Sequence, residues 1–376
     1  MFPRGEDRKG FLPMPKKKSS DPLFAMPKKR HVMPYVVLLV IVLIFSGIFI
    51  YNMLLNTHVA VETSRITVSS LPSKLENFRI CVISDLDGQF FGPNQEYLYE
   101  AVTSQECSVL CVVGDICDRT GSPRALVRLI SRLDPGTKVL FIPGDEDPNP
   151  IRSEPHPETD ARAPYVIELT EAGAVYLDAP VSVTVGDATV WFCPESVYQM
   201  DVDTGESTAQ KRMAELMKEP WSEQNEAWIS ATNYQLDRYA RIREAQRTMT
   251  SADIQIAVSH APLSETSIRE LHDAYSKGQS IYIGGISLII SGHQNAGVWR
   301  LPGGGAIWVP SSFTVKTPGY FPSDVGLRGL QTVLGISQYI TSGLGTSSAY
   351  PGLMRSFRLF NQPAVSILTL TRKLNN

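Results

Sequence analysis

The chain has 376 residues and a mass of 41.5 kDa, with 43% hydrophobic and 19% charged residues. This composition excludes a disordered chain and a protein with many membrane spans, and it suits one large domain with short additions. The formal net charge of −3 combines two unequal parts. Residues 1–33 carry nine Lys or Arg against three acidic residues, a net charge of +6, so the rest of the chain carries −9. This asymmetry predicts two environments or two partners.

The chain opens with a basic, proline-rich tail. Met14-Pro15-Lys16-Lys17 is repeated as Met26-Pro27-Lys28-Lys29, and five prolines lie within the first 27 residues. Because proline disrupts a helix, we expect this tail to be disordered. Two interpretations of its charges stay open: a topology signal, or a polybasic segment that binds anionic lipid.

A long apolar run follows the tail. Residues 34–55 contain no charged side chain, and a helix of this length spans the roughly 30 Å hydrocarbon core of a membrane. A cleaved signal peptide is the rival interpretation, but its apolar region is usually about 7–15 residues long and no Ala-x-Ala-like site follows Leu55. We therefore predict a single-pass anchor in the cell membrane. The position of the Lys and Arg residues predicts a cytoplasmic N-terminus and an extracytoplasmic body, residues 56–376.

Three apolar, β-branched runs in the body each end in an acidic turn. With their turns, these runs are residues 75–88, 105–118 and 137–147. Helix-length segments lie between them, at 93–104 and 123–133. Alternating strands and helices predict an α/β sheet. Because chemistry gathers at the strand ends of such sheets, the acidic turns are candidates for one shared site.

Up to seven carboxylates would meet if the sheet brings these turns together. They are Asp85, Asp87, Asp115, Asp118, Asp145, Glu146 and Asp147. Two later strand-like runs end in His260 and His293. Aspartate is common in turns, but five strand ends with Asp or His favour a site over chance. Like charges in a partly buried cleft are costly, so we expect bound cations there.

Residues 196–250 differ in composition from the rest of the body. The segment is acidic at first and then rich in Lys, Arg, Gln and Ala. We expect about two helices, which form an insertion whose aromatic residues supply its own core. Our hypothesis is that this insertion covers the cleft and selects the substrate.

In this order the motifs resemble those of the calcineurin-like metallophosphoesterases, and among them the membrane-anchored bacterial type. The family pattern is Asp-x-His, Gly-Asp-x-x-Asp, Gly-Asn-His-Asp/Glu, a lone His and Gly-His-x-His. The corresponding segments here are Asp85-Leu86-Asp87, Gly114 to Asp118, Gly144 to Asp147, His260, and Gly292 to Asn295. The resemblance extends from about Leu75 to Leu370 and includes the closing segments 343–346 and 358–361. It implies an α/β fold with two packed β-sheets flanked by helices, a four-layer sandwich.

The resemblance also implies two divalent metal ions, with Asp115 as the bridging ligand. One position would be held by Asp115, Asp145, His260 and His293, where only the family's Asn is replaced, by Asp145. The other position would be held by Asp85, Asp87, Asp115 and Asn295, and both of its family histidines are gone. All three replacements are oxygen donors, so Mn²⁺ or Mg²⁺ is favoured over Zn²⁺ or iron. Glu146 stands where the family has its catalytic His acid.

Two functions stay open for these residues. The first is hydrolysis of a phosphomonoester or phosphodiester at the outer face of the membrane, with Asp115 and Glu146 as catalytic residues. Glu146 could protonate the leaving oxygen only with a raised pKa, whereas nearby cations would lower that pKa. The second is a catalytically impaired binding or scaffold module, since each replacement needs a single base change. We expect membrane lipid and a phosphate ester as partners, and no nucleic acid, because the body carries a charge of −9.

Overall fold

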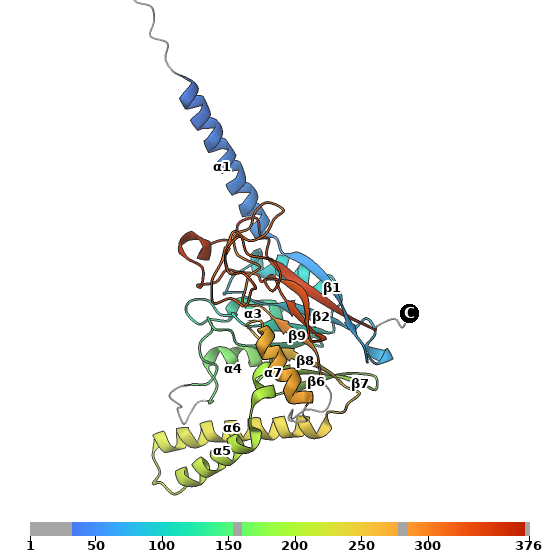
Figure 1. Ribbon diagram of the computed structural model, residues 1–376. Coiled ribbons are helices and arrows are strands. Elements are labelled where there is room, and N and C mark those ends of the chain that lie inside the picture. Colours follow the sequence, from blue (N-terminus) through green and yellow to red (C-terminus); the bar gives the residue numbers. More distant parts are fainter. Residues whose placement is uncertain (1–31, 153–159, 277–284, 373–376) are drawn as a thin grey trace, which may run out of the picture. The chain divides into compact units, whose positions relative to one another are not determined.

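The computed structural model describes residues 32–152, 160–276 and 285–372 (Figure 1). Of the tail for which we expect disorder, residues 1–33, residues 1–31 lie outside the described residues. The described residues up to Phe49 and those from Ile50 onward belong to two compact units. Helix α1 (Met33–Thr57) is the one helix of the described residues that is long and apolar enough to cross a membrane. It contains the whole run 34–55 that the sequence marks as a span.

Two six-stranded sheets form the centre of the second unit. In spatial order, the first sheet contains β1 (Ala60–Val68), β14 (Ala364–Arg372), β2 (Arg79–Ile83), β3 (Val109–Val113), β4 (Lys138–Ile142) and β5 (Val175–Tyr176). The second contains β12 (Gly329–Val333), β13 (Ile336–Ile340), β9 (Ile286–Ser291), β8 (Ile254–Val258), β7 (Ala188–Pro194) and β6 (Val181–Val185). A two-stranded ribbon pairs β10 (Trp308–Val309) with β11 (Gly319–Tyr320).

Helices connect these strands and flank the sheets. The α-helices are α2 (Glu96–Thr103), α3 (Arg124–Ile130), α4 (Pro164–Glu171), α5 (Val202–Leu216), α6 (Glu223–Thr248) and α7 (Glu265–Ser276). Short 3-10 turns are η2 (Ser73–Leu75), η3 (Pro93–Gln95), η4 (Glu195–Gln199) and η5 (Gly352–Arg355). The expected helix segments at 93–104 and 123–133 therefore correspond to α2 and α3.

The strand directions bring the acidic turns to one edge. β2, β3 and β4 are parallel neighbours, so the turns that follow them leave the sheet at the same side. In the second sheet β8 and β9 are also parallel neighbours, and His260 and His293 follow them. Parallel strands joined by helical crossovers therefore collect residues that are far apart in the chain.

The apolar core lies in three layers. Between the sheets, branched aliphatic side chains such as Val82, Leu140 and Ile256 are buried. On the outer face of the first sheet, Val112 packs in one cluster with residues of α2, α3 and α4. On the outer face of the second, α5, α6 and α7 contribute to two further clusters. This arrangement confirms the predicted α/β fold of two sheets flanked by helices.

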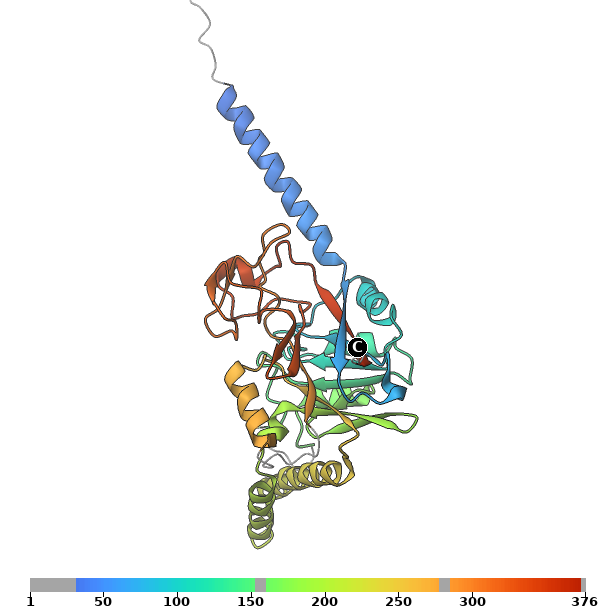
Figure 2. The ribbon, with the colours of Figure 1, turned by 45° about the vertical axis from the view of Figure 1, so that its right-hand side comes forward.

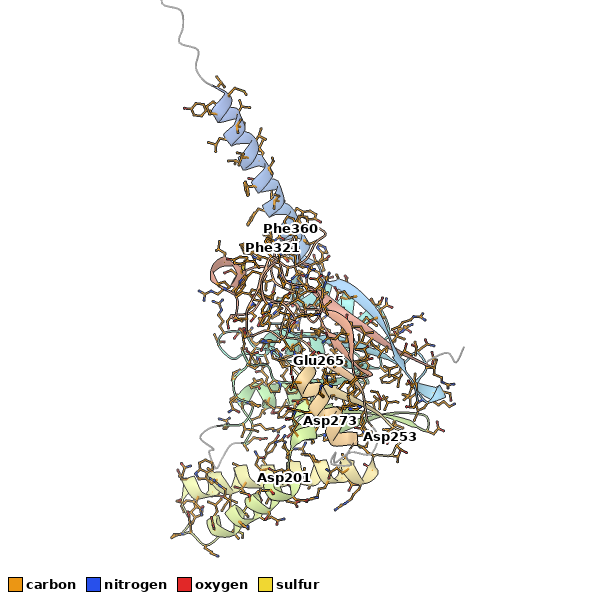
Figure 3. The ribbon with its side chains drawn as sticks, in the orientation of Figure 1. Asp201, Asp253, Glu265, Asp273, Phe321 and Phe360 are labelled. Carbon is orange, nitrogen blue, oxygen red and sulfur yellow. The ribbon has the colours of Figure 1, made fainter. Side chains whose placement is uncertain are left out.

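Helices α5 and α6 occupy the segment 196–250 and pack against each other (Figures 1 and 2). Each begins at a side-chain cap. The carboxylate of Asp201, which is labelled in Figure 3, accepts from the Thr204 N–H at 3.0 Å, and the Ser222 hydroxyl accepts from the Asn225 N–H at 3.0 Å. Such caps satisfy N–H groups that the helix itself leaves unpaired. The local sequence thus defines both helix starts.

Candidate metal centre

The turns after β2 and β3 are held together by their backbones. Asp85, Asp87 and Asp115 have positive φ angles of 54°, 50° and 51°. Such values are uncommon for residues other than glycine, and aspartate tolerates them better than most. The Asp85 N–H donates to the Gly114 carbonyl at 3.0 Å, and the Asp87 N–H donates to the Asp115 carbonyl at 2.9 Å. The two turns therefore support each other's unusual backbone.

Four side chains gather at the meeting point of the two sheets. They are Asp115, Asp145, His260 and His293. Each offers one atom that can bind a metal ion, and these four atoms all lie within 4.8 Å of one another. Asp145 Oδ1 is 2.8 Å from His260 Nε2 and 3.0 Å from His293 Nδ1. The two imidazoles hold the pKa of Asp145 well below its usual range. We call these residues the four-residue cluster; they match the better preserved of the two positions that the family resemblance implies.

The ring of His260 is oriented from outside the cluster. Its Nδ1 lies 2.8 Å from the Val113 carbonyl, which can only accept, so Nδ1 carries the hydrogen and Nε2 faces Asp115 and Asp145. Burial lowers the pKa of His260, but the neighbouring carboxylates of Asp115 and Asp145 outweigh this effect, and the pKa is raised well above its usual value. A backbone carbonyl that orients one ring nitrogen while the other faces inward is the usual arrangement of a metal-binding histidine.

The Asp115 carboxylate has one fixed and one open oxygen. Oδ1 accepts from the Glu146 N–H at 2.9 Å. Oδ2 is buried and has no hydrogen-bond partner, and His260 Nε2 lies 3.2 Å away without hydrogen-bond geometry. A buried carboxylate oxygen without a partner is costly. Since the cluster offers two carboxylates and two imidazoles, its residues fit a divalent cation, which would satisfy this oxygen.

Two glycines make room for the cluster. A Cβ on Gly114 would lie 2.4 Å from His260 Nδ1, and a Cβ on Gly144 would lie 2.0 Å from Asp115 Oδ1. Both distances are far below van der Waals contact, so any side chain at these positions would displace a residue of the cluster. Glycine at both positions therefore allows the backbone to approach the cluster closely.

The other predicted ligands lie beside the cluster but bond to the protein. Asp85 Oδ1 accepts from Asn295 Nδ2 at 3.2 Å, and Asp85 Oδ2 accepts from the Ser84 hydroxyl and from the His293 N–H. Asp87 Oδ2 accepts from the Thr346 N–H at 3.0 Å. Burial raises the pKa of Asp85 to about 6 and that of Asp87 to about 9, where nearby carboxylates add to the effect. Their assignment as metal ligands stays a prediction.

Two of the seven carboxylates have a different task. Asp147 accepts from the N–H groups of Ile116, Cys117 and Gly144, and so ties the second turn to the third. Asp118 accepts from two N–H groups of its own turn. Both side chains therefore stabilise the backbone of the turns. The sequence allows up to seven carboxylates at one centre, because an aspartate that stabilises a turn and an aspartate that binds a metal occupy the same kind of position in the sequence.

Glu146 is held by a loop near the C-terminus. Its Oε1 accepts from the Ser347 hydroxyl at 2.9 Å and from the Ser348 N–H at 2.6 Å. A proton for general-acid catalysis would therefore have to be carried by Oε2. Its catalytic role stays a prediction.

Residues of the closing segments take part in the site, although the sequence assigns them no role. Thr346 binds Asp87 through its N–H, and the buried Arg358 guanidinium donates to Asn295 Oδ1 at 3.2 Å. The resemblance includes both segments, yet no spacing relates them to the acidic turns. The pairing of β13 with β9 and the position of β14 between β1 and β2 bring this end of the chain to the centre.

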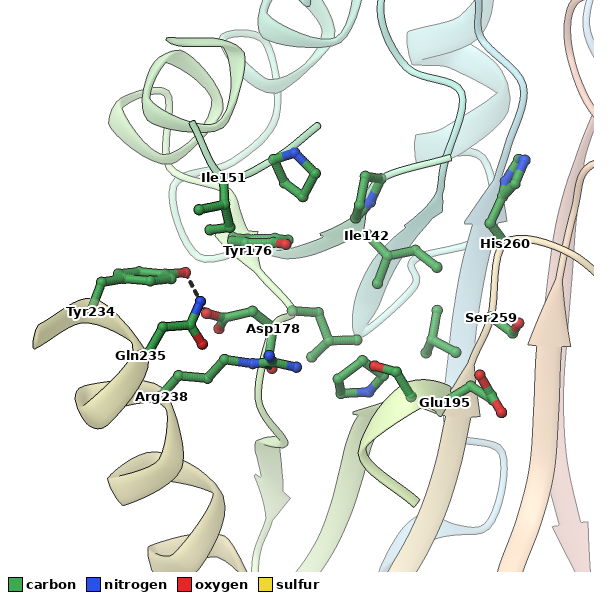
Figure 4. Close-up of a pocket in the computed structure, with 16 residues that line it drawn as sticks. Ile142, Ile151, Tyr176, Asp178, Glu195, Tyr234, Gln235, Arg238, Ser259 and His260 are labelled. Carbon is green, nitrogen blue, oxygen red and sulfur yellow. Dashed lines mark hydrogen bonds between the residues drawn. The ribbon is translucent and has the colours of Figure 1, made fainter. Parts of the chain in front are cut away.

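Cavities lie on two sides of the centre. One, of about 330 Å³, extends from His260 to Tyr234, Gln235 and Arg238 of α6 and is shown in Figure 4. Asp178 also lines it and bonds to the Tyr234 hydroxyl.

The other, of about 630 Å³, borders Asp87 and Glu146 and also contains Arg119 and Arg355. A ligand at the centre could thus extend to either side.

Comparison with known proteins identifies the family of this chain. No curated protein matches the sequence. A solved structure that the chain is similar to is the phosphopantetheinyl hydrolase of Mycobacterium tuberculosis, with 17% identity and a TM-score of 0.34, covering 72% of this chain and 91% of that one. The family model of the calcineurin-like phosphoesterases matches residues 78–296, which include every acidic turn and both histidines. The chain therefore belongs to the calcineurin-like phosphoesterase family.

Proposed function

We propose that this member of a metal-dependent phosphoesterase family hydrolyses a phosphomonoester or a phosphodiester at the outer face of the cell membrane. The observation that carries the proposal is the four-residue cluster, in which a buried carboxylate oxygen of Asp115 faces two imidazoles and a second carboxylate. A cation in this cluster would supply Lewis-acid stabilisation of the charge that develops on the phosphoryl oxygens.

The protein supplies position and rigidity. Val113 fixes the ring of His260, and the Glu146 N–H fixes Asp115, so neither ligand has to reorganise when substrate binds. Asp145 is 62% exposed and lies at the solvent side of the cluster, where a substrate would arrive. Glu146 borders the larger cavity and is the residue that we assign to protonation of the leaving oxygen.

The metal is Mn²⁺ or Mg²⁺ rather than Zn²⁺ or iron in this proposal. The cluster offers two carboxylates and two imidazoles, and Asp145 replaces the amide that the family resemblance implies. An added carboxylate favours harder cations. Metal content of the purified chain, and activity after reconstitution with each ion, test this assignment.

The retained ester group of a phosphodiester, on the side of the phosphorus away from Glu146, is proposed to occupy the cavity between His260 and α6. Apolar side chains such as Tyr176 and Ile151 line it together with Gln235 and Arg238 (Figure 4). This arrangement supports the hypothesis that the insertion 196–250 covers the cleft and selects the substrate. A cavity of about 330 Å³ is at the lower end of the range for small-molecule sites.

The test of activity compares phosphomonoesterase and phosphodiesterase assays of the full chain in detergent with the same assays of Asp115→Ala. We expect hydrolysis that needs an added divalent cation and falls at least about a hundredfold in the variant. A folded protein that binds no metal and hydrolyses neither substrate class would support the scaffold interpretation instead.

The test of the cavity is Gln235→Trp, which fills the space beside α6. We expect a higher KM for phosphodiesters with a bulky retained ester group and an unchanged metal content. Asn233→Trp, at an exposed position of the same helix, is the matched control. Equal substrate profiles in the two variants would refute the role of the insertion.

The orientation in the membrane is proposed from α1 and the charge of +6 in residues 1–33. Protease added to intact cells or spheroplasts should digest the body and spare the tail. Digestion only after lysis would place the body in the cytoplasm.

A further inference from the structure

We infer that this chain binds one divalent cation, in the four-residue cluster, and that hydrogen bonds from Asn295 and Arg358 close the second position that the family resemblance implies. The inference rests on the proposed function and refines its metal centre. The residues at this second position are Asp85, Asp87 and Asn295. Their hydrogen bonds do not suit the binding of a metal ion.

The amide of Asn295 presents the wrong atom to a cation. Its Nδ2 donates to Asp85 Oδ1 at 3.2 Å and to the His293 carbonyl at 3.4 Å, while its Oδ1 accepts from Arg358 Nη1 at 3.2 Å. A guanidinium can only donate and a backbone carbonyl can only accept, so these neighbours determine which way the amide faces. Cations bind the oxygen of an amide. That oxygen is already used, and the N–H groups point at Asp85.

Arg358 is fixed in this place. Its side chain is buried, at 3% exposure, and donates to the carbonyls of Asn361, Gly345 and Ser342 at 2.9, 2.7 and 2.8 Å. Four acceptors hold the guanidinium, so it cannot turn away to release Asn295. Its positive charge acts on the Asp85 and Asp87 carboxylates. A permanent cation therefore lies next to the position where a second metal ion would have to bind, and the two would repel.

Three of the four carboxylate oxygens of Asp85 and Asp87 also accept hydrogen bonds from the protein. Asp85 is fully buried, and its Oδ2 accepts from the Ser84 hydroxyl and from the His293 N–H at 3.2 Å. Asp87 Oδ2 accepts from the Thr346 N–H, and a Cβ at Gly345 would come within 2.3 Å of this oxygen.

Asp115 Oδ2 differs from these oxygens of Asp85 and Asp87, because it is buried and has no hydrogen-bond partner. Among the described residues, the four-residue cluster is the one group of three or more His, Cys, Asp or Glu with its ligand atoms within 4.8 Å of one another.

The experiment counts ions without relying on activity. The full chain, purified in detergent and stripped of metal, is titrated with Mn²⁺, and bound ions are measured by elemental analysis and electron paramagnetic resonance. We expect one Mn²⁺ per chain, with the hyperfine spectrum of an isolated ion. Two ions per chain, or a spectrum of exchange-coupled Mn²⁺, would overturn the inference.

Two variants locate the ion. Asp145→Ala should reduce Mn²⁺ affinity at least tenfold, because it removes a ligand of the cluster, whereas the isosteric Asp85→Asn should still bind one ion. Loss of binding in Asp85→Asn with intact binding in Asp145→Ala would place the ion at the other position and overturn the inference.

The outcome is separable from that of the proposed function. Two ions with hydrolysis would refute only the single-ion centre, and one ion without hydrolysis would refute only the activity. A chain that binds neither Mn²⁺ nor Mg²⁺ would refute both.

Discussion

The two oxygens of Asp115 show how a single side chain defines this centre. Oδ1 is fixed by the Glu146 N–H, and Oδ2 points into the cluster without a hydrogen-bond partner. The backbone thus aims the carboxylate, and the open oxygen gives the cluster its affinity for positive charge. In the same way the Val113 carbonyl aims His260. Ligands aimed by the backbone retain their geometry when the site is empty.

At Glu146 the proposed acid role predicts a dependence on the leaving group. In Glu146→Gln the side chain can still accept from Ser347 and Ser348 but carries no acidic proton. We expect kcat to fall about a hundredfold or more for alkyl phosphates and far less for nitrophenyl phosphates, whose leaving groups need no proton. Steady-state kinetics with both substrate types measure this. An equal loss for both would show that Glu146 acts only through position.

At Gly144 the close approach to Asp115 predicts a double effect. Gly144→Ala places a methyl group 2.0 Å from Asp115 Oδ1, so the strand end or the carboxylate must move. We expect a free energy of unfolding lower by about 1–3 kcal/mol, together with a metal affinity at least tenfold weaker. Denaturant unfolding and Mn²⁺ titration measure the two quantities. Gly136→Ala, where no heavy atom lies within 4 Å, is the matched control and should change neither.

Sequence patterns predict the residues of the cluster but not their hydrogen-bond partners. Asp115, Asp145, His260 and His293 follow apolar strands, and this position is visible in the sequence. The contact of Arg358 with Asn295 leaves no such signal, because neither residue has a periodic environment and the contact depends on the tertiary fold. For the same reason, the sequence does not distinguish an aspartate that stabilises a turn from an aspartate that could bind a metal ion.

At the scale of elements, the strand pattern was the reliable part of the sequence. The runs at 75–88, 105–118 and 137–147 contain β2, β3 and β4, and their buried strands have the β-branched composition typical of parallel sheets. The apolar run 306–310 looks like a strand of five residues in the sequence, but only the two residues of β10 form one. Short apolar runs are ambiguous because they lack the length that defines a strand.

Helix α6 is attached to the first sheet through Asp178, which follows β5. The buried carboxylate accepts from both Arg241 Nη atoms at 2.6 and 2.9 Å and from the Tyr234 hydroxyl, and the Asp178 carbonyl accepts from Arg238 Nε at 2.8 Å. These contacts hold the helix that borders the cavity. They connect the insertion to the edge of the centre.

Removing this carboxylate should loosen α6. In Asp178→Ala we expect the amides of α6 to exchange hydrogen at least tenfold faster, since charge-assisted bonds contribute about 1.5–3 kcal/mol each. Hydrogen exchange with mass spectrometry measures this. Asp203→Ala removes an ion pair whose acidic side chain is 86% exposed and should have little effect. Similar exchange in both variants would show that packing alone holds α6.

For the whole molecule, the charge of −9 outside residues 1–33 has a partial local explanation. Several carboxylates of this surplus lie at or next to the four-residue cluster. A bound cation offsets part of their repulsion and should therefore stabilise the entire body, because folding and binding are linked.

Metal removal should lower the melting temperature. A cation at about a hundred times its Kd contributes about 2.7 kcal/mol, which corresponds to a loss of about 5 °C on adding EDTA. Differential scanning calorimetry of the full chain measures the shift. Asp115→Ala should melt at the same temperature with and without EDTA. If EDTA lowered the melting temperature of the variant as much as that of the unchanged chain, the stabilising ion would bind elsewhere.

The place of β14 between β1 and β2 affects how the protein is made. Ala60 pairs with Ala364, so β1 cannot pair with β14 until the residues between these two strands have left the ribosome. Contacts so distant in sequence close slowly. During this interval β1 and β2 lack the strand that joins them, and their unpaired edges invite aggregation. Folding of the first sheet is therefore expected to be post-translational and to need chaperone protection until then.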